Sequence, residues 1–345
     1  MKKIVMLRKH IFSSIPATVF LLLIGFVLLW GLPLAIEWGV IKATWTGTST
    51  KDCHTGGACW AMIHARWDQF MYGFYPSDER WRVDAALGLL GVAMIACGIL
   101  RYRLYIKVLM MIGVMLFVVF LLYGGAGLSI VATNKWGGLF LTIILSFGAI
   151  ACALPIALML ALGRNSSLMI IKGLCISAIE LIRGVPLISI LFMASVMLPL
   201  FFPQEIVIDK LLRAFIAITL FQAAYLAEVA RGGLNSLPVG QQEAAYALGM
   251  GYWQTMILVI LPQALRVVIP GMVNSFIALF KDTTLVLMIG LFDFLGIVQS
   301  ATTDPRWLGT ALEGYIFCAF VYWLFCFSMS MYSKYLEHKL KVKSF

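Results

Sequence analysis

Oppositely charged residues interrupt an apolar stretch of the chain near position 180. Glu180 and Arg183 stand three positions apart, a spacing that lets the two side chains pair on one helix. Gly184 and Pro186 follow, and together they predict that this helix breaks or kinks here. Ionisable groups within a membrane-crossing segment are expensive, so their default interpretation is a path for a polar molecule.

A second polar group lies in the apolar stretch 266–291. Lys281 and Asp282 are adjacent there, and Asn274 precedes them by about two helical turns. Two interpretations stay open for both groups. The charges pair with one another and lock helices together, or they line a passage that offers a permeating molecule one group of each sign and neutral hydrogen-bond partners.

The composition indicates that these charges lie in a lipid bilayer. Of the 345 residues, 62% are hydrophobic and only 12% are charged, and a soluble protein of this size cannot bury so much apolar surface. A helix needs about 20 apolar residues to cross the hydrocarbon core. The first such stretch is too long for a signal peptide, so we expect it to be retained. The sequence predicts an all-α integral membrane protein with about eight transmembrane helices, at residues 15–36, 84–100, 104–124, 138–162, 170–199, 211–230, 266–291 and 312–332.

The distribution of Lys and Arg predicts how the chain is oriented. If both termini are cytoplasmic, the cytoplasmic segments carry far more basic than acidic residues, whereas the outer segments do not, as the positive-inside rule requires. Arg101, Arg103 and the whole segment 231–265 then face the cytoplasm. Because the basic runs adjoin apolar stretches and form no patch on a soluble domain, we expect no nucleic-acid partner.

Cysteine and histidine positions bear on redox and metal chemistry. Cys53 and Cys59 lie in the predicted outer loop 37–83, where an oxidising compartment would favour a disulfide. A metal site there would need more ligands than the neighbouring His54. The other cysteines fall in apolar stretches and are expected to act as small apolar side chains. All histidines lie outside these stretches, which counts against a haem or another redox centre within the membrane.

A stretch too short and too polar to cross a bilayer separates the sixth and seventh apolar segments. Its sequence, "NSLPVGQQEAAYALGMG", predicts a helix of about three turns. Asn235 and Ser236 are typical N-cap residues, and Pro238 suits the first turn. Gly249 and Gly251 should end the helix. A second short apolar segment follows and is expected to stop at the next Leu-Pro pair.

One face of this short helix should carry small side chains. Ala244, Ala245 and Leu248 occupy neighbouring helical positions, with Glu243 beside them. Small side chains allow another surface to approach closely, and a single carboxylate can fix the register against a basic residue of a partner. The alternative is an amphipathic connector that lies on the membrane surface.

The spacing of these residues forms a longer motif. It consists of Glu243, Ala244, Ala245, Gly249 and, nine residues later, Val259, Ile260, Leu261 and Pro262. This pattern resembles the EAA loop of ABC importer permeases, which usually have isoleucine where Val259 stands.

Other stretches resemble the polar amino acid uptake subfamily of these permeases. They are "ELIRGVPLISILF" at 180–192, "AAYLAEVARGGLNSLPVGQQEAA" at 223–245 and "LPQALRVVIPGMVNSFIALFKDTTLV" at 261–286. Many relatives have Thr where Val185 stands and Ser where Thr284 stands. The resemblance covers about residues 136–340, and the extra N-terminal part is similar to the longer permease subunit of general L-amino acid importers.

The resemblance implies a division of the chain and a role for the loop. Residues 136–345 would form a type I ABC importer permease core of five helices. Residues 1–135 would form an extension with three helices and a periplasmic loop. The loop 231–265 would dock into a groove of a cytoplasmic ATPase subunit and couple its closure to the membrane helices. The residues expected to do so are Glu243, Ala244, Ala245, Gly249, Leu261 and Pro262.

The function implied is a permease subunit that translocates L-amino acids delivered by a periplasmic binding protein across the bacterial inner membrane. Two ATP-binding cassette subunits and a second homologous permease subunit would complete the importer. No Lys follows a Gly in this chain, so it has no P-loop to bind phosphates. ATP and Mg²⁺ would bind to the partner ATPase subunits, and this chain is expected to bind no cofactor or metal and to be no enzyme.

In such a permease the intramembrane charges acquire specific roles. Glu180 and Asp282 would receive the ammonium group of the substrate, Arg183 and Lys281 its carboxylate, and Asn274 would be a neutral contact. The alternative function is a secondary amino acid transporter driven by an ion gradient, which would also carry charges at mid-membrane. Such a transporter has no need of the loop, and no inverted repeat is evident in the sequence.

Overall fold

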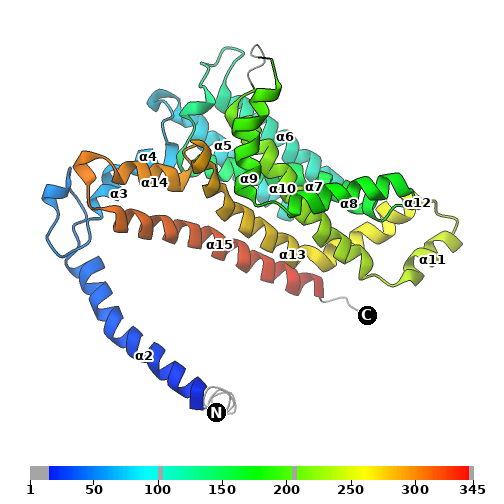
Figure 1. Cartoon of the computed structure of the whole chain (residues 1–345), viewed down its shortest axis with the longest axis horizontal. Helices are drawn as coiled ribbons and strands as arrows, with labels where there is room; N and C mark the ends of the chain where they lie inside the picture. The colour runs from blue at the N-terminus through cyan, green and yellow to red at the C-terminus, as the bar shows by residue number, and fades with distance from the viewer. Residues whose placement is uncertain (1–14, 100–103, 204–207, 342–345) are drawn as a thin grey trace. The chain divides into compact units, whose positions relative to one another are not determined.

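The computed structural model describes residues 15–99, 104–203 and 208–341, and its regular structure there is helical (Figure 1). The α-helices are α2 (Ile15–Ile36), α3 (Ala61–Ala65), α4 (Trp67–Tyr72), α5 (Arg80–Ile99), α6 (Leu104–Tyr123), α7 (Gly138–Arg164), α8 (Met169–Arg183), α9 (Leu187–Phe192), α10 (Lys210–Asn235), α11 (Val239–Ala247), α12 (Tyr252–Gln254), α13 (Leu261–Asp282), α14 (Phe294–Thr302) and α15 (Ala311–Lys341). Short π- and 3₁₀-helical turns extend several of them.

The membrane-crossing helices match the apolar stretches of the sequence. Within the described ranges, seven helical segments are long and apolar enough to cross a bilayer, and one bent pair of helices supplies an eighth. The prediction of an all-α fold with about eight transmembrane helices is confirmed. The seven segments are Pro16–Ile41, Ser77–Gly98, Ile106–Tyr123, Gly138–Arg164, Lys210–Asn235, Tyr252–Ile289 and Ala311–His338.

The bent pair lies where glycine and proline predict a break. Helix α8 ends at Arg183, and the following segment Leu187–Phe201 turns away from it by 99°. Pro186 has ψ 143° as the residue before α9, and it has no N–H to continue the ladder of α8. The predicted interruption at Gly184 and Pro186 is therefore confirmed.

The segment after the short helix is longer than predicted. It runs as one helical stretch of 38 residues from Tyr252 to Ile289, so it does not stop at Leu261 and Pro262. A π-helical turn, Thr255–Ile260, comes directly before Leu261 and Pro262. Because a proline ring clashes with the carbonyl four residues earlier in an α-helix, the wider π turn gives the ring room and lets the helix continue.

The described chain divides into two compact units. One contains residues up to 67 together with 299–317, and the other contains 68–298 together with the residues from 318 onward. These boundaries do not follow the division at residue 135 that the resemblance implies, and that division stays a prediction.

Small residues hold together the core of the larger unit. Helices α7 and α10 pack along their lengths (Figure 1), and Ala153, Ala157, Ala223 and Ala227 are fully or almost fully buried between neighbouring helices. In a membrane, small side chains let helix backbones approach closely and gain van der Waals contact. Gly233 marks the closest approach to α13, since a Cβ atom there would lie 2.8 Å from the carbonyl oxygen of Ala264.

Two segments distant in the sequence make up the smaller unit. The backbone N–H of Cys59 donates to Oε1 of Glu313 at 2.9 Å, and Arg66 pairs with Asp304. The side chain and backbone N–H of Arg306 also bond Asp304 and hold the pKa of that carboxyl below its usual range. These polar contacts join the region after α2 to the segment around the start of α15.

A disulfide closes the loop after α2. The sulfurs of Cys53 and Cys59 are bonded, with Cα atoms 5.6 Å apart, within the usual range for disulfides. Mass spectrometry of non-reduced peptides from membranes is expected to find the two cysteines joined. Since the closed loop is short, reduction should destabilise only this loop, by about 2 kcal/mol or less on the chain-entropy view. Two free thiols in protein from the native envelope would contradict the prediction.

Candidate functional site

The short helix of the motif is α11, and it starts later than predicted. Asn235 is the last residue of α10, and Ser236 is its C-cap, with its hydroxyl donating to the carbonyl of Gly233 at 2.8 Å. Helix α11 begins after Pro238, which makes no side-chain capping bond. The assignment of Asn235 and Ser236 as N-cap residues was wrong. Asn235 continues α10, and the hydroxyl of Ser236 satisfies an unpaired carbonyl at the end of that helix.

The C-terminus of α11 is built around Gly249, as the sequence predicts, whereas Gly251 is the N-cap of α12. Gly249 has φ +78°, in the left-handed region that glycine adopts without steric penalty. Its N–H bonds the carbonyl of Tyr246 at 2.9 Å, and the N–H of Met250 bonds that of Ala245 at 3.1 Å. These two bonds form a Schellman motif, which satisfies carbonyls left free at the helix end.

The two alanines of the motif point in different directions. Ala245 is only 3% exposed, and α11 packs against the π turn Thr255–Ile260. Glu243 and Ala244 are exposed, and Leu248 is 83% exposed. The expected small-residue face is therefore divided. Ala245 packs α11 against the rest of this chain. Glu243, Ala244 and Leu248 form an accessible surface, which we call the α11 surface.

The remaining motif residues lie at the start of α13. Leu261 is partly buried and Pro262 is exposed, and both belong to the first turn of the helix, where proline is well tolerated. They follow directly on the π turn that supports α11. The motif therefore consists of an exposed helix and the helical turns on which it rests.

The charged residues near position 180 converge on one carboxylate of α10. Glu228 lies 3.1 Å from Nη1 of Arg164 and 3.7 Å from Nη1 of Arg183, and Nε of Arg231 donates to it at 3.0 Å. Arg164 also pairs with Glu180 at 3.1 Å. We call these five residues the Glu228 cluster, which joins the ends of α7 and α8 to α10.

The predicted pair between Glu180 and Arg183 is replaced by these contacts. Glu180 pairs with Arg164, whereas Arg183 reaches Glu228 and also lies over the ring of Tyr225, 5.4 Å from its centroid. A guanidinium gains from the face of an aromatic ring as well as from a carboxylate, so Arg183 has two attractive partners on α10. With three arginines and two glutamates, the cluster carries one excess positive charge.

The three polar residues of α13 do not join this cluster. Asn274 and Lys281 are exposed, and Asp282 is partly buried. Within the described residues, no ion pair forms on Lys281 or Asp282, and none of the three bonds to Glu180 or Arg183. The sequence suggested one passage lined by five residues, but the structure distributes them over two separate groups.

Sequence reasoning missed the part that Arg164 plays. Its position at the end of an apolar stretch indicates only an orientation charge, and the positions of Glu228 and Arg231 indicate a structural role at the end of their helix. The spacing of Glu228 and Arg231, three residues apart, signals their own pair. No neighbouring residue indicates that Arg164 pairs with Glu228, because the two are 64 residues apart in the sequence.

The fold and the exposed loop helix define an all-helical, multi-pass membrane permease. Residues 153–342 match the model of the family described as "binding-protein-dependent transport system inner membrane component". The chain belongs to this family.

Its relatives carry consistent names. The chain is 53% identical over 344 residues to an inner membrane amino-acid ABC transporter permease protein, YhdY, of Escherichia coli K12, with 98% of this chain and 93% of the relative covered. It is 38% identical over 405 residues to the glutamate/glutamine/aspartate/asparagine transport system permease protein BztC of Rhodobacter capsulatus, with 97% and 93% covered.

Shorter relatives match 59% of this chain. The glutamate/aspartate import permease protein GltK of Escherichia coli is 33% identical over 207 residues, which cover 59% of this chain and 91% of that protein. A crystal structure of an amino acid ABC transporter with histidines is 31% identical, with a TM-score of 0.52, and the match covers 59% of this chain and 92% of that one. Each of these two matches covers nearly all of the shorter protein and leaves part of this chain unmatched.

Proposed function

We propose that this chain is the transmembrane permease subunit of an ATP-driven importer that translocates L-amino acids delivered by a periplasmic binding protein. The α11 surface carries this proposal, because it is an exposed helix, fixed by a Schellman glycine, in a chain of the binding-protein-dependent transport family. An ion-gradient transporter has no use for such a surface. The names of the full-length relatives support amino acids as the substrate class.

The partners follow from this role. Two ATP-binding cassette subunits would bind ATP and Mg²⁺ and hydrolyse the nucleotide, since the sequence has no P-loop. A second homologous permease subunit would complete the passage, and a periplasmic protein would deliver the amino acid. The chain itself is then no enzyme. It would lie in the bacterial inner membrane with both termini in the cytoplasm.

We propose a direct role for the exposed charges along the passage. Glu180 is 55% exposed in its side chain and Arg183 is 32% exposed, so both remain accessible to a substrate although they pair within the cluster. Lys281, Asp282 and Asn274 would supply a second contact region along α13. Groups of both signs would offset the cost of removing water from the two charges of an amino acid inside the apolar passage.

Reconstitution tests the proposed function directly. The chain is co-expressed with its partner permease and ATPase subunits, and proteoliposomes of the complex are given the binding protein and radiolabelled amino acids. Uptake should require ATP and should persist in the presence of an uncoupler. Uptake that follows an ion gradient and needs no ATPase subunit would overturn the proposal.

Cysteine accessibility tests the proposed orientation. Gln241 is exposed on α11, so Gln241→Cys should react with an impermeant thiol reagent in inverted vesicles and not in intact spheroplasts. Thr48→Cys, exposed in the loop after α2, is the matched control and should react from the opposite side. Arg101 and Arg103 lie outside the described residues, and cysteines there should behave like position 241. Labelling of position 241 in intact spheroplasts would reject this orientation.

A further inference from the structure

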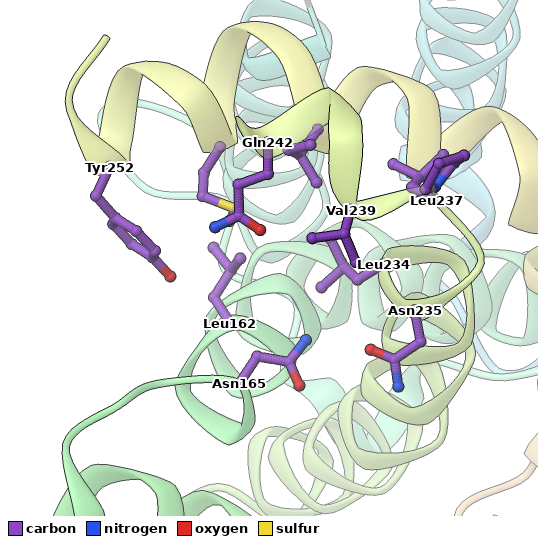
Figure 2. Close-up of a pocket in the computed structure, with 11 residues that line it drawn as sticks. Leu162, Asn165, Leu234, Asn235, Leu237, Val239, Gln242 and Tyr252 are labelled. Carbon is purple, nitrogen blue, oxygen red and sulfur yellow. The ribbon is translucent and has the colours of Figure 1, made fainter. Parts of the chain in front are cut away.

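A cavity of about 340 Å³ lies where α11 and α12 meet the ends of α7 and α10. Figure 2 shows the side chains of Asn165 and Gln242 approaching this space from opposite sides, with Asn235 at the end of α10 nearby. The cavity adjoins the α11 surface and contains none of the charged residues described above. Its lining consists of Leu162, Asn165, Leu234, Asn235, Leu237, Pro238, Val239, Gln242, Tyr252, Met256 and Ile260.

The lining combines polar and apolar side chains and carries no ionised group. Asn165, Asn235 and Gln242 each present an amide with donor and acceptor atoms, and Tyr252 adds a hydroxyl that can do both. The other lining residues are apolar. A nucleotide or another phosphate would need Lys or Arg, and the neighbouring Arg164 is already paired with Glu180 and Glu228. The lining therefore suits a small molecule without net charge that needs both donors and acceptors.

The amides are available to such a molecule. Among the described residues, the side chains of Asn165 and Asn235 bond to no other residue, and Gln242 uses its N–H to bond Tyr246 at 3.0 Å, which leaves its carbonyl oxygen to accept. Ligand pockets usually measure about 300–1,000 Å³. A cavity at the lower end of this range holds one small metabolite.

We propose that this cavity binds a free zwitterionic amino acid from the side of the membrane that α11 faces, and that its binding slows transport. This inference rests on the proposed function, under which the amino acids on that side are the imported product. The amide N–H groups would bind the carboxylate, the amide oxygens would bind the ammonium group, and the apolar wall would contact the side chain. A bound molecule contacts α11 and α12 on one side and α7 and α10 on the other, so it favours this arrangement over any in which these elements separate.

Transport into preloaded vesicles tests the proposal. Proteoliposomes of the complete importer contain either buffer or millimolar unlabelled L-glutamine, and initial uptake of radiolabelled L-glutamine is measured. Internal L-glutamine should lower the initial rate of the wild type at least about fivefold, the lower end of typical allosteric coupling. The double variant Asn165→Leu/Asn235→Leu should transport normally into empty vesicles and lose the inhibition.

A matched control separates the cavity from a general effect of replacing asparagine. Asn134 is exposed in the short turn that precedes α7, and Asn134→Leu should keep the inhibition of the wild type. An absence of uptake into empty vesicles by the wild type would contradict the proposed function itself. Normal uptake without inhibition, or equal inhibition in the wild type and the double variant, would overturn only the cavity proposal.

A labelling experiment covers the case in which the double variant does not assemble. Asn165→Cys is reacted with a thiol reagent in the purified complex, and modification of that peptide is followed by mass spectrometry. L-Glutamine should slow modification at position 165 and leave it unchanged at Asn134→Cys. Equal rates at position 165 with and without L-glutamine would reject the proposal.

Discussion

Replacement of Gly249 by aspartate is expected to abolish ATP-driven uptake while the protein still inserts and assembles with its partner permease. Gly249 has φ +78°, and a Cβ atom there would meet no atom within 4 Å. The new side chain would therefore extend outward beside the exposed Leu248. When α11 docks onto the ATPase subunit, this carboxylate would be buried in the interface. We expect the uptake rate to fall at least about 100-fold, which corresponds to roughly 2.8 kcal/mol. This is a reasonable cost for an unpaired charge at an interface.

The control for this variant separates charge from backbone conformation. Asparagine has nearly the same shape as aspartate, and both residues tolerate the left-handed conformation better than other residues with a Cβ atom. Gly249→Asn should therefore retain much more uptake and stimulated ATPase activity than Gly249→Asp. Glu243→Lys, which reverses an exposed charge on the same surface, should act like Gly249→Asp. Normal transport and ATPase stimulation in both charge variants would show that the α11 surface does not dock.

Features that depend on local chemistry were predictable from the sequence. The length of an apolar run fixes whether a helix can cross the bilayer, so the transmembrane helices were found. The break after Arg183 follows from the missing N–H of Pro186, and the end of α11 follows from the conformational freedom of Gly249. Each of these depends on a few adjacent residues and on no distant partner.

Features that depend on tertiary contacts were not predictable in this way. Ala244 and Ala245 are chemically identical, and only the packing of α11 on the π turn makes one exposed and the other buried. Glu180 and Arg183 satisfy the spacing of a helical pair, yet each finds a better-placed partner on another helix. The cavity beside α11 combines residues from four helices and their connections, and none of them is unusual in its own stretch of sequence.

Neutralisation of Glu228 is expected to weaken the assembled permease more than neutralisation of any other member of the Glu228 cluster. Glu228→Gln leaves Arg164, Arg183 and Arg231 without their shared carboxylate. Removal of one partner from a buried ion pair costs about 3–5 kcal/mol. The side chain of Glu228 is 23% exposed, so water screens part of the interaction. We therefore expect the free energy of unfolding to fall by about 2–3 kcal/mol. The amount of folded complex recovered and its thermal midpoint, which should fall by roughly 5 °C, measure the effect.

Two control variants show whether a loss of stability in Glu228→Gln comes from the loss of its charge. Asp68 pairs with Arg80 on the surface, with its own side chain 66% exposed, so Asp68→Asn should change stability by less than about 1 kcal/mol. Glu228→Asp keeps the charge with a shorter side chain and should recover part of the loss. Equal stability of Glu228→Gln and the wild type would show that the cluster does not hold α7, α8 and α10 together.

Variants of Asp282, Glu180 and Arg183 decide between the two interpretations of the intramembrane charges. Asp282 has no ion pair within the described residues, so Asp282→Asn should assemble normally. If Asp282 lines the passage, this variant will change the order in which acidic, neutral and basic amino acids stimulate the reconstituted ATPase. Glu180→Gln should change that order too, since Glu180 is the most exposed member of the cluster, while Glu228→Gln should mainly lower stability. An unchanged order for Asp282→Asn, Glu180→Gln and Arg183→Gln, each in a normally assembled complex, would mean that none of these charges contacts the substrate.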